Sequence, residues 1–151
     1  MRPRLGRLDE VYPGYSIYFI TFCTHGRTDL LANPILHESF RSFCLSGKER
    51  NVLVGRYVIM PDHLHFFVHF SDQADVSMWI KSLKNGLSKT LRQSGSLAPH
   101  WQKGYFDHLV RSEQSYEEKW DYVRENPVRK GLAADTSTWP YQGEIVPLPF
   151  N

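Results

Sequence analysis

The chain has little of several features that would point to a function at once. Its 151 residues carry a formal net charge of only +2, which permits a nucleic-acid partner but does not require one. The two cysteines, Cys23 and Cys44, lack the CxxC spacing of zinc and redox motifs and lie in patterns typical of small buried side chains. No apolar run has membrane-spanning length and no signal peptide is found, so we expect no membrane partner and a reducing cytosol.

The composition that is present is that of a globular protein, with 41% hydrophobic and 14% aromatic residues. A chain of this length is expected to form one domain, residues 1–151, around a real hydrophobic core. Within it, residues 1–13 are expected to form a basic arm that carries Arg2, Arg4 and Arg7. Residues 133–151 are expected to form a C-terminal tail.

Hydrophobic periodicity predicts strands and helices in a recognisable order. Strands are expected over residues 15–23, 52–60, 63–70 and 105–110, and helices from Pro34 to Gly47, over 75–92, and from a capping box at Ser115 to Asn126-Pro127. Pro61-Asp62 has turn chemistry, so the second and third strands should form a hairpin. The order predicts a ferredoxin-like α+β sandwich, an antiparallel sheet with helices on one face, to which a C-terminal helix is added.

The most informative stretch is His63-Leu64-His65, at the start of the third expected strand. Successive side chains on a strand point to opposite faces, so the two histidines share one face while Leu64 enters the core. His69 continues the histidine face. Two imidazoles held rigidly at this spacing suit a metal ion, although such a pair also fits the solvent face of an amphipathic strand.

A second set of candidate residues lies on the last expected helix. Tyr116, Trp120 and Val123 recur at helical spacing and form its apolar stripe, and Tyr122 lies roughly 120° from the centre of that stripe. Asn126 follows four residues later, which would place it on the same face as Tyr122. Together they could present a nucleophile and a third metal ligand; the alternative is a surface tyrosine and an asparagine cap.

These residue types suit metal-assisted phosphoryl transfer. A phenol with a pKa of about 10 is protonated at neutral pH and needs a base or a cationic field to attack a phosphate. A divalent ion polarises the phosphate oxygens, and two imidazoles with one amide oxygen leave coordination positions open for phosphate and water. The ligands leave the metal undecided, since imidazole favours transition metals whereas phosphoryl chemistry commonly uses Mg²⁺ or Mn²⁺.

Basic side chains gather on one face of the expected helix over residues 75–92. They are Lys81, Lys84 and Arg92, with Ser88 between them and Lys89 alongside. This is either an ordinary solvated face or a track for a nucleic-acid backbone, in which case the arm and Arg124, Arg129 and Lys130 would add to it. The aromatic residues Trp101, Tyr105 and Phe106 could stack unpaired bases, although burial is expected for at least two of them.

Three segments together resemble the single-tyrosine HUH transposases of small insertion sequences, and most closely their REP-associated relatives, the RAYT group. The segments are Val58-Ile59-Met60-Pro61-Asp62-His63-Leu64-His65, Trp101-Gln102-Lys103-Gly104-Tyr105-Phe106-Asp107-His108 and Tyr122-Val123-Arg124-Glu125-Asn126-Pro127-Val128-Arg129-Lys130-Gly131-Leu132. They occur in the family's order, and the resemblance covers nearly the whole chain.

The resemblance implies a bacterial cytoplasmic enzyme that cleaves and joins single-stranded DNA through a 5′-phosphotyrosine intermediate. By motif position, His63 and His65 correspond to the metal-binding pair, Tyr122 to the nucleophile and Asn126 to a polar third ligand. It also implies that the protein binds REP hairpins, which are repeated palindromes of bacterial genomes. Members of the wider family act as monomers or homodimers, so the oligomeric state stays open.

Two other functions remain compatible with the sequence. The first is a non-catalytic nucleic-acid-binding regulator on the same fold, which would bind DNA without capturing it covalently. The second is a metal hydrolase of another substrate that uses His63 and His65, and its turnover would survive the substitution Tyr122→Phe.

Overall fold

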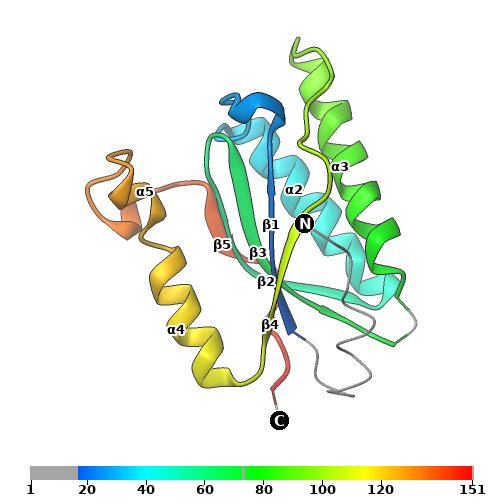
Figure 1. Cartoon of the computed structure of the whole chain (residues 1–151), viewed down its shortest axis with the longest axis vertical. Helices are drawn as coiled ribbons and strands as arrows, with labels where there is room; N and C mark the ends of the chain where they lie inside the picture. The colour runs from blue at the N-terminus through cyan, green and yellow to red at the C-terminus, as the bar shows by residue number, and fades with distance from the viewer. Residues whose placement is uncertain (1–16, 73, 151) are drawn as a thin grey trace.

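The computed structural model describes residues 17–72 and 74–150 of the chain. The expected arm, with Arg2, Arg4 and Arg7, lies outside the described residues. The elements of the described ranges are β1 (Ile17–Cys23), η1 (His25–Arg27), α2 (Pro34–Ser46), η2 (Gly47–Arg50), β2 (Val52–Ile59), β3 (His63–Phe70), α3 (Val76–Gln93), β4 (Phe106–Val110), α4 (Glu113–Val123), α5 (Asn126–Arg129), η3 (Thr136–Thr138) and β5 (Gln142–Glu144). The predicted α+β class and the order strand, helix, strand, strand, helix, strand are confirmed (Figure 1).

The strands of the described residues form one antiparallel sheet in the order β4-β1-β3-β2-β5. The expected hairpin joins β2 and β3 through Pro61-Asp62, and the backbone N–H of Met60 donates to the carbonyl of His63 at 2.8 Å across the turn. The turn therefore fixes where β3 begins and holds its first histidine at the end of the sheet.

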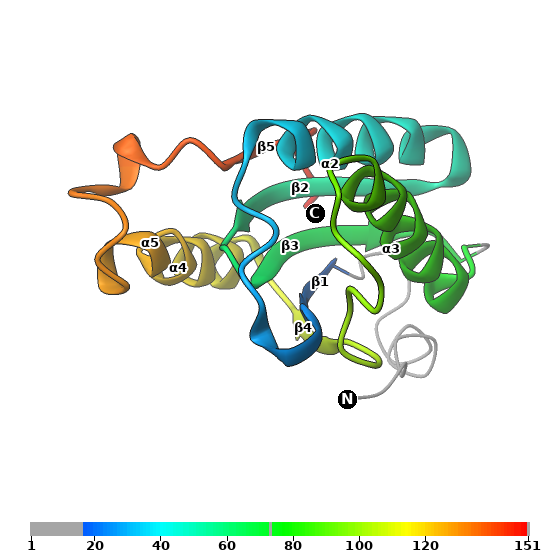
Figure 2. The same ribbon diagram turned by 90° about the horizontal axis from the view of Figure 1, so that it is seen from above.

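Helices cover both faces of this sheet. α2 and α3 pack on one face and α4 packs on the other (Figures 1 and 2). Alternation along β3 divides its side chains between the two layers. Leu64 and Phe66 join the core beneath α2 and α3, whereas Phe67 meets Tyr116 of α4 edge to face, with ring centroids 4.6 Å apart. His63 and His65 share the face of Phe67, which is the face that α4 covers.

The two long helices begin where capping residues satisfy their first backbone N–H groups. Asn33 accepts from the N–H of Leu36 at 2.9 Å, and Asp75 accepts from that of Met78 at 3.0 Å. The predicted apolar stripe of α3 is buried as a set: Trp79, Ile80, Leu83, Leu87 and Leu91. Along the described ranges, no helix combines the length and the apolar character that a membrane crossing requires.

The expected bounds of the tyrosine helix were wrong at both ends. Ser112 is the N-cap of α4 and accepts from the N–H of Ser115, so the capping box expected at Ser115 does not start the helix. At the other end α4 stops at Val123. Pro127 has no N–H to donate to the carbonyl of Val123 four residues earlier, and it instead opens the short helix α5 beside Asn126.

The expected tail is part of the fold. β5 adds to the free edge of β2, with Arg56 opposite Glu144 and Val58 opposite Gln142. Trp139 is 8% exposed, and its indole N–H donates to the carbonyl of Ile59 at 3.1 Å. The segment over residues 133–150 therefore closes the layer that contains α4 and covers the edge of the sheet.

Candidate active site

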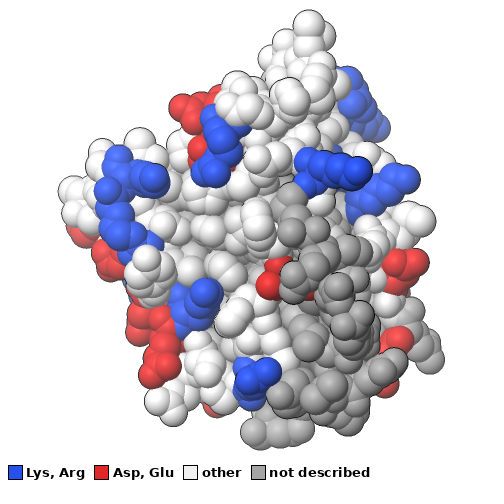
Figure 3. Space-filling model, viewed as in Figure 1, with Lys and Arg blue, Asp and Glu red and all other residues white. Residues whose placement is uncertain are grey.

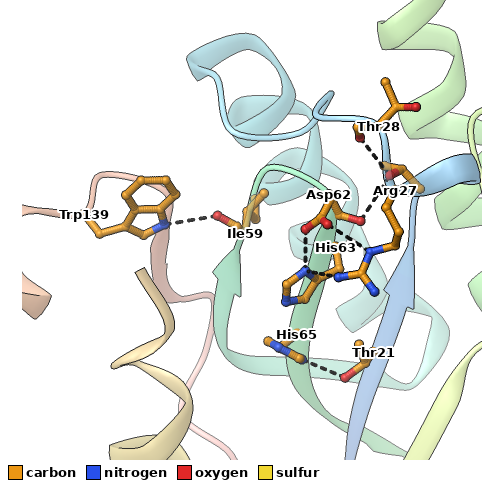
Figure 4. Close-up of polar contacts among 9 residues, drawn as sticks. Thr21, Arg27, Thr28, Ile59, Asp62, His63, His65 and Trp139 are labelled. Atoms are coloured by element: carbon orange, nitrogen blue, oxygen red, sulfur yellow. Dashed lines mark hydrogen bonds and ion pairs between the residues drawn. The ribbon is translucent and has the colours of Figure 1, made fainter. Parts of the chain in front are cut away.

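The two histidines of β3 lie beside one another on the sheet face that α4 covers (Figure 4). Their ring centroids are 4.7 Å apart and their planes are inclined by 77°. Leu64 between them is fully buried on the opposite face, as predicted. The backbone thus holds both imidazoles at a fixed separation without using either to fill the core under α2 and α3.

The Nδ1 atom of each imidazole is engaged by a neighbouring side chain. Nδ1 of His63 lies 2.7 Å from a carboxylate oxygen of Asp62, and Nδ1 of His65 lies 2.7 Å from the hydroxyl oxygen of Thr21 (Figure 4). With the proton of His63 on Nδ1, that ring donates to the carboxylate and its lone pair is on Nε2. A partner of this kind fixes the tautomer and the orientation of a metal-binding histidine.

Asp62 is held in its ionised form by a second partner. The Nε–H of Arg27 donates to its other carboxylate oxygen at 2.9 Å (Figure 4). Burial raises the pKa of Asp62, but the hydrogen bonds from His63 and Arg27 outweigh burial and leave that pKa below its ordinary value. A charged acceptor is therefore available to His63 at neutral pH.

Both imidazoles are neutral at neutral pH. Burial lowers the pKa of His63 despite the nearby Asp62. It also lowers the pKa of His65 to about 3, with help from His63 in its protonated form and from the charges of Lys119 and Arg129. Neutral imidazole is the form that binds metal ions. The pair is thus in the protonation state of a ligand.

Packing places α4 next to the histidine pair. Phe19 of β1 stacks on His65, with ring centroids 5.1 Å apart and planes inclined by 21°. The ammonium of Lys119, on α4, lies 4.9 Å from the centre of the same Phe19 ring. Two successive contacts, from Lys119 to Phe19 and from Phe19 to His65, therefore connect α4, the helix that contains Tyr122, to a candidate metal-binding imidazole.

Tyr122 lies on the exposed side of α4, as its offset from the apolar stripe predicted. Its side chain is 65% exposed, whereas Tyr116 and Val123 are each 3% exposed. Burial in the core therefore does not explain the tyrosine.

Arg129 joins Tyr122 to Asn126 across the break between α4 and α5. One guanidinium nitrogen donates to the backbone carbonyl of Tyr122 at 2.9 Å, and another donates to the side-chain oxygen of Asn126 at 2.7 Å. The guanidinium carbon also lies 4.2 Å from the centre of the Tyr122 ring. The continuous helix expected to bring Tyr122 and Asn126 onto one face is absent, and Arg129 connects them instead.

The donor set fits a divalent ion with open coordination positions. Among residues 17–72 and 74–150, no group of three His, Cys, Asp or Glu side chains could hold a metal, so a third protein ligand would be of another type. The amide oxygen of Asn126 accepts one hydrogen bond from Arg129 and keeps a second lone pair. His63 and His65 through Nε2, with Asn126, are the residues that would hold the ion.

The predicted basic face of α3 is smaller than the sequence indicated. Lys81 and Arg92 are exposed, but the ammonium of half-buried Lys84 donates to the carbonyls of Gly104 at 2.6 Å and Gln102 at 3.3 Å. Ser88, expected on the same face, is buried. The segment over residues 101–104 folds back onto this side of α3, and the periodicity of α3 alone gives no sign of that contact.

Other cations border the face that carries the histidines. Figure 3 shows Lys and Arg side chains along α4 and α5 and again toward α3, while Asp and Glu gather at the outer edge of α4. Arg129 makes the contacts described above, and Arg124 donates to the hydroxyl of Thr136 at 3.1 Å. The contacts of Arg124 and Arg129 with DNA stay a prediction. In the structure, both side chains donate hydrogen bonds to other residues of the protein.

The chain is similar in sequence and fold to known transposases. The family model described as "Transposase IS200 like" matches residues 15–126. An uncharacterized protein of Haemophilus influenzae is 21% identical to this chain, and the match covers 78% of this chain and 83% of that protein. The REP-associated tyrosine transposase of Escherichia coli K12 is 25% identical, and the match covers 85% of this chain and 75% of that protein. The solved structure of a REP-associated tyrosine transposase bound to a REP hairpin superposes with a TM-score of 0.65, at 23% identity, over 84% of this chain and 75% of that one.

The family match spans most of the chain, including β3 with its histidine pair and the segment from Tyr122 to Asn126. The fold agrees with that of the solved relative. The chain belongs to the IS200-like transposase family, and within it resembles the REP-associated tyrosine transposases.

Proposed function

We propose that this protein is a metal-dependent endonuclease and strand transferase of single-stranded DNA that acts through a 5′-phosphotyrosine on Tyr122. One observation carries the proposal. A neutral histidine pair, each ring held at Nδ1, lies on the sheet face beside the helix of an exposed tyrosine, and that tyrosine is tied through Arg129 to an amide oxygen. Such a set can hold a divalent ion and a nucleophile together.

Tyr122 is the nucleophile of the proposed cleavage step and the leaving group of the proposed joining step. In cleavage, the hydroxyl oxygen of Tyr122 attacks the scissile phosphorus, and the bond from phosphorus to the 3′ oxygen of the upstream nucleotide breaks. The phenolic proton passes to solvent, and the departing 3′ oxygen takes up a proton. In joining, a 3′-hydroxyl attacks the same phosphorus, and the oxygen of Tyr122 leaves and is protonated.

The remaining residues hold this arrangement. A bound Mg²⁺ or Mn²⁺ would polarise the non-bridging oxygens of the phosphate. Asp62 and Thr21 fix the two imidazoles that would bind it. Arg129 fixes the amide of Asn126 and the backbone of Tyr122. The side chains therefore supply orientation, which accounts for a large part of catalysis in phosphoryl transfer.

We further propose that the substrates are REP-type hairpins with a single-stranded flank. Support comes from the Escherichia coli relative, which is named a REP-associated tyrosine transposase, and from the solved relative, which is bound to a REP hairpin. The cations that Figure 3 shows along α4 and α5 and toward α3 are of the sign that a DNA backbone requires.

Covalent capture tests the proposal. Hairpin oligonucleotides with randomised flanks and a 3′ label are incubated with Mn²⁺ and resolved under denaturing conditions. The wild type should yield a labelled protein band, and Tyr122→Phe should yield none while still shifting the hairpin on a native gel. Tyr141→Phe, at a ring that packs against Trp139, is the matched control and should keep the band. Hairpin binding with no adduct in the wild type would instead support a non-catalytic regulator.

A further inference from the structure

Phe106 is an exposed aromatic residue without a role in the core or in the chemistry above. Of the three aromatics considered for base stacking, Tyr105 is 5% exposed, and Trp101 donates its indole N–H to Ser88 at 2.8 Å and to the carbonyl of Lys84 at 3.1 Å. Tyr105 is thus buried and Trp101 is half-buried, which leaves Phe106, 52% exposed at the start of β4.

The sheet register places Phe106 in line with the candidate metal site. Phe106 of β4 lies opposite Thr21 of β1, and Thr21 lies opposite His65 of β3. Directly opposed side chains of an antiparallel pair share one face, and the hydrogen bond between Thr21 and His65 shows that the histidine face is the one in question. Two strand spacings separate the backbones of Phe106 and His65, which is about 10 Å.

The surroundings of Phe106 on this face match a nucleic acid rather than an apolar partner. The next residue of β4 on this face is His108, which is exposed and lies opposite Phe19 of β1. The ammonium of Lys119 lies 4.9 Å from the centre of the Phe19 ring. Figure 3 shows further Lys and Arg side chains along α4 and toward α3. A single exposed ring among cations gives too little apolar area for a protein interface, but it suits a base whose phosphates are held by the surrounding charges.

We infer that Phe106 is a stacking platform for an unpaired base of single-stranded DNA, near the phosphate that the histidine site would hold. This inference rests on the proposed function, and it names a substrate contact that the function does not require. The platform would read no sequence by hydrogen bonding, because every base has a π-face. It would instead set how far the single-stranded DNA extends from the candidate metal site toward the edge of the β-sheet.

Equilibrium binding without chemistry tests the platform. The titrations use Tyr122→Phe protein in chelator, so that neither cleavage nor a metal ion contributes. The probes are two hairpins that differ only in the single-stranded flank, which is oligothymidine in one and an abasic strand of the same length in the other. The added substitutions are Phe106→Ala, Phe106→Leu and Phe106→Trp. Leu97→Ala, which removes a side chain that is 87% exposed on the loop after α3, is the control.

Stacking predicts a specific pattern of affinities. Phe106→Ala should weaken binding of the thymidine flank by about 5- to 150-fold, Phe106→Leu should also lose affinity, and Phe106→Trp should retain it. None of the three should change affinity for the abasic flank, and Leu97→Ala should change neither.

Three results would overturn the platform. They are equal binding of the thymidine flank by the Phe106→Ala and Leu97→Ala proteins, full retention by Phe106→Leu, and an equal loss on both flanks. Failure of the Tyr122→Phe protein itself to bind either hairpin would overturn the proposed DNA substrate as well, which separates the two proposals.

Discussion

The guanidinium of Arg129 lies over the ring of Tyr122, with 4.2 Å between its central carbon and the ring centroid. The same guanidinium donates to the side-chain oxygen of Asn126 at 2.7 Å. A planar group whose donors are fixed in one fork suits a simultaneous contact with a ring and an amide, because its geometry is set in advance. We therefore regard Arg129 as a residue that positions the proposed nucleophile and the proposed third ligand relative to one another.

Replacing Arg129 should slow the covalent step more than it weakens DNA binding. Charge-assisted hydrogen bonds contribute about 1.5–3 kcal/mol each, so Arg129→Gln should lower the rate of adduct formation by roughly 10- to 100-fold. Arg129→Lys should restore little of the rate of adduct formation, because lysine keeps the positive charge but lacks the planar set of fixed donors. Single-turnover kinetics separate rate from affinity, with Arg50→Gln, at an exposed residue of η2, as the control. Full activity in the Arg129→Lys protein would show that charge alone suffices.

Removing the carboxylate behind His63 should weaken the metal site without removing it. Asp62→Asn keeps the shape of the side chain but loses the ionised acceptor for Nδ1 of His63. Loss of such a partner typically lowers the metal affinity by about 10- to 100-fold. Calorimetric titration with Mn²⁺ measures the change, and Asp29→Asn, at an exposed residue just after η1, should bind as the wild type does. Unchanged Mn²⁺ affinity in the Asp62→Asn protein would argue against His63 as a ligand.

The double substitution His63→Ala with His65→Ala should abolish Mn²⁺ binding and adduct formation. Asn126→Ala should weaken the metal affinity less, because one neutral ligand is lost while both imidazoles remain. His65 stacks on Phe19 at 5.1 Å and His63 is only 9% exposed, so the double substitution should also lower the Tm. Calorimetry below that Tm isolates the binding effect, and intact Mn²⁺ binding would refute the site.

The two lysines of α3 should behave differently when each is replaced by alanine. Lys84→Ala removes hydrogen bonds to the carbonyls of Gly104 and Gln102, so it should lower the Tm and loosen the segment that carries Trp101. Lys81→Ala should barely change the Tm, because Lys81 is exposed. If Lys81 touches a phosphate, its loss should flatten the plot of log affinity against log salt by about 0.7. An equal fall in Tm for both variants would contradict the structural role given to Lys84.

Stability of the metal-free protein should fall with acid in a way that depends on His65. The folded pKa of His65 is about 3, below the ordinary value of about 6.5 that applies in the unfolded chain. Between these values the unfolded chain binds a proton that the folded chain does not, so the free energy of unfolding decreases as the pH falls, by at most about 1.4 kcal/mol per pH unit. Denaturant titrations in chelator from pH 7 to 4 should show a shallower decrease for His65→Gln. The control His25→Gln, at an exposed residue of η1, should follow the wild type.

Short-range patterns predicted the framework of the site well. The bounds of β3, the two-residue turn before it and the buried stripe of α3 all follow from alternation, helical spacing and proline chemistry. The offset of Tyr122 from its stripe likewise predicted an exposed tyrosine. These features depend on residues a few positions apart, which is the range that sequence patterns describe.

Features that depend on distant contacts were missed or wrong. β5 has the sequence Gln142-Gly143-Glu144, which lacks the alternation of a strand and pairs only because the edge of β2 is free. The burial of Lys84 depends on a segment some twenty positions later. The break after Val123 could have been located from Pro127, because the missing N–H affects the residue four positions earlier. The bridging role of Arg129 exists only because of that break.

Locating the bond between protein and DNA tests directly whether Tyr122 is the nucleophile. After reaction with a hairpin and Mn²⁺, the adduct is digested with protease and nuclease and sequenced by mass spectrometry. The peptide containing Tyr122 should carry the 5′-phosphate of the downstream strand, and chelator should abolish this adduct. Attachment to another residue, or cleaved DNA with a free 5′-phosphate and no adduct, would exclude Tyr122 as the nucleophile.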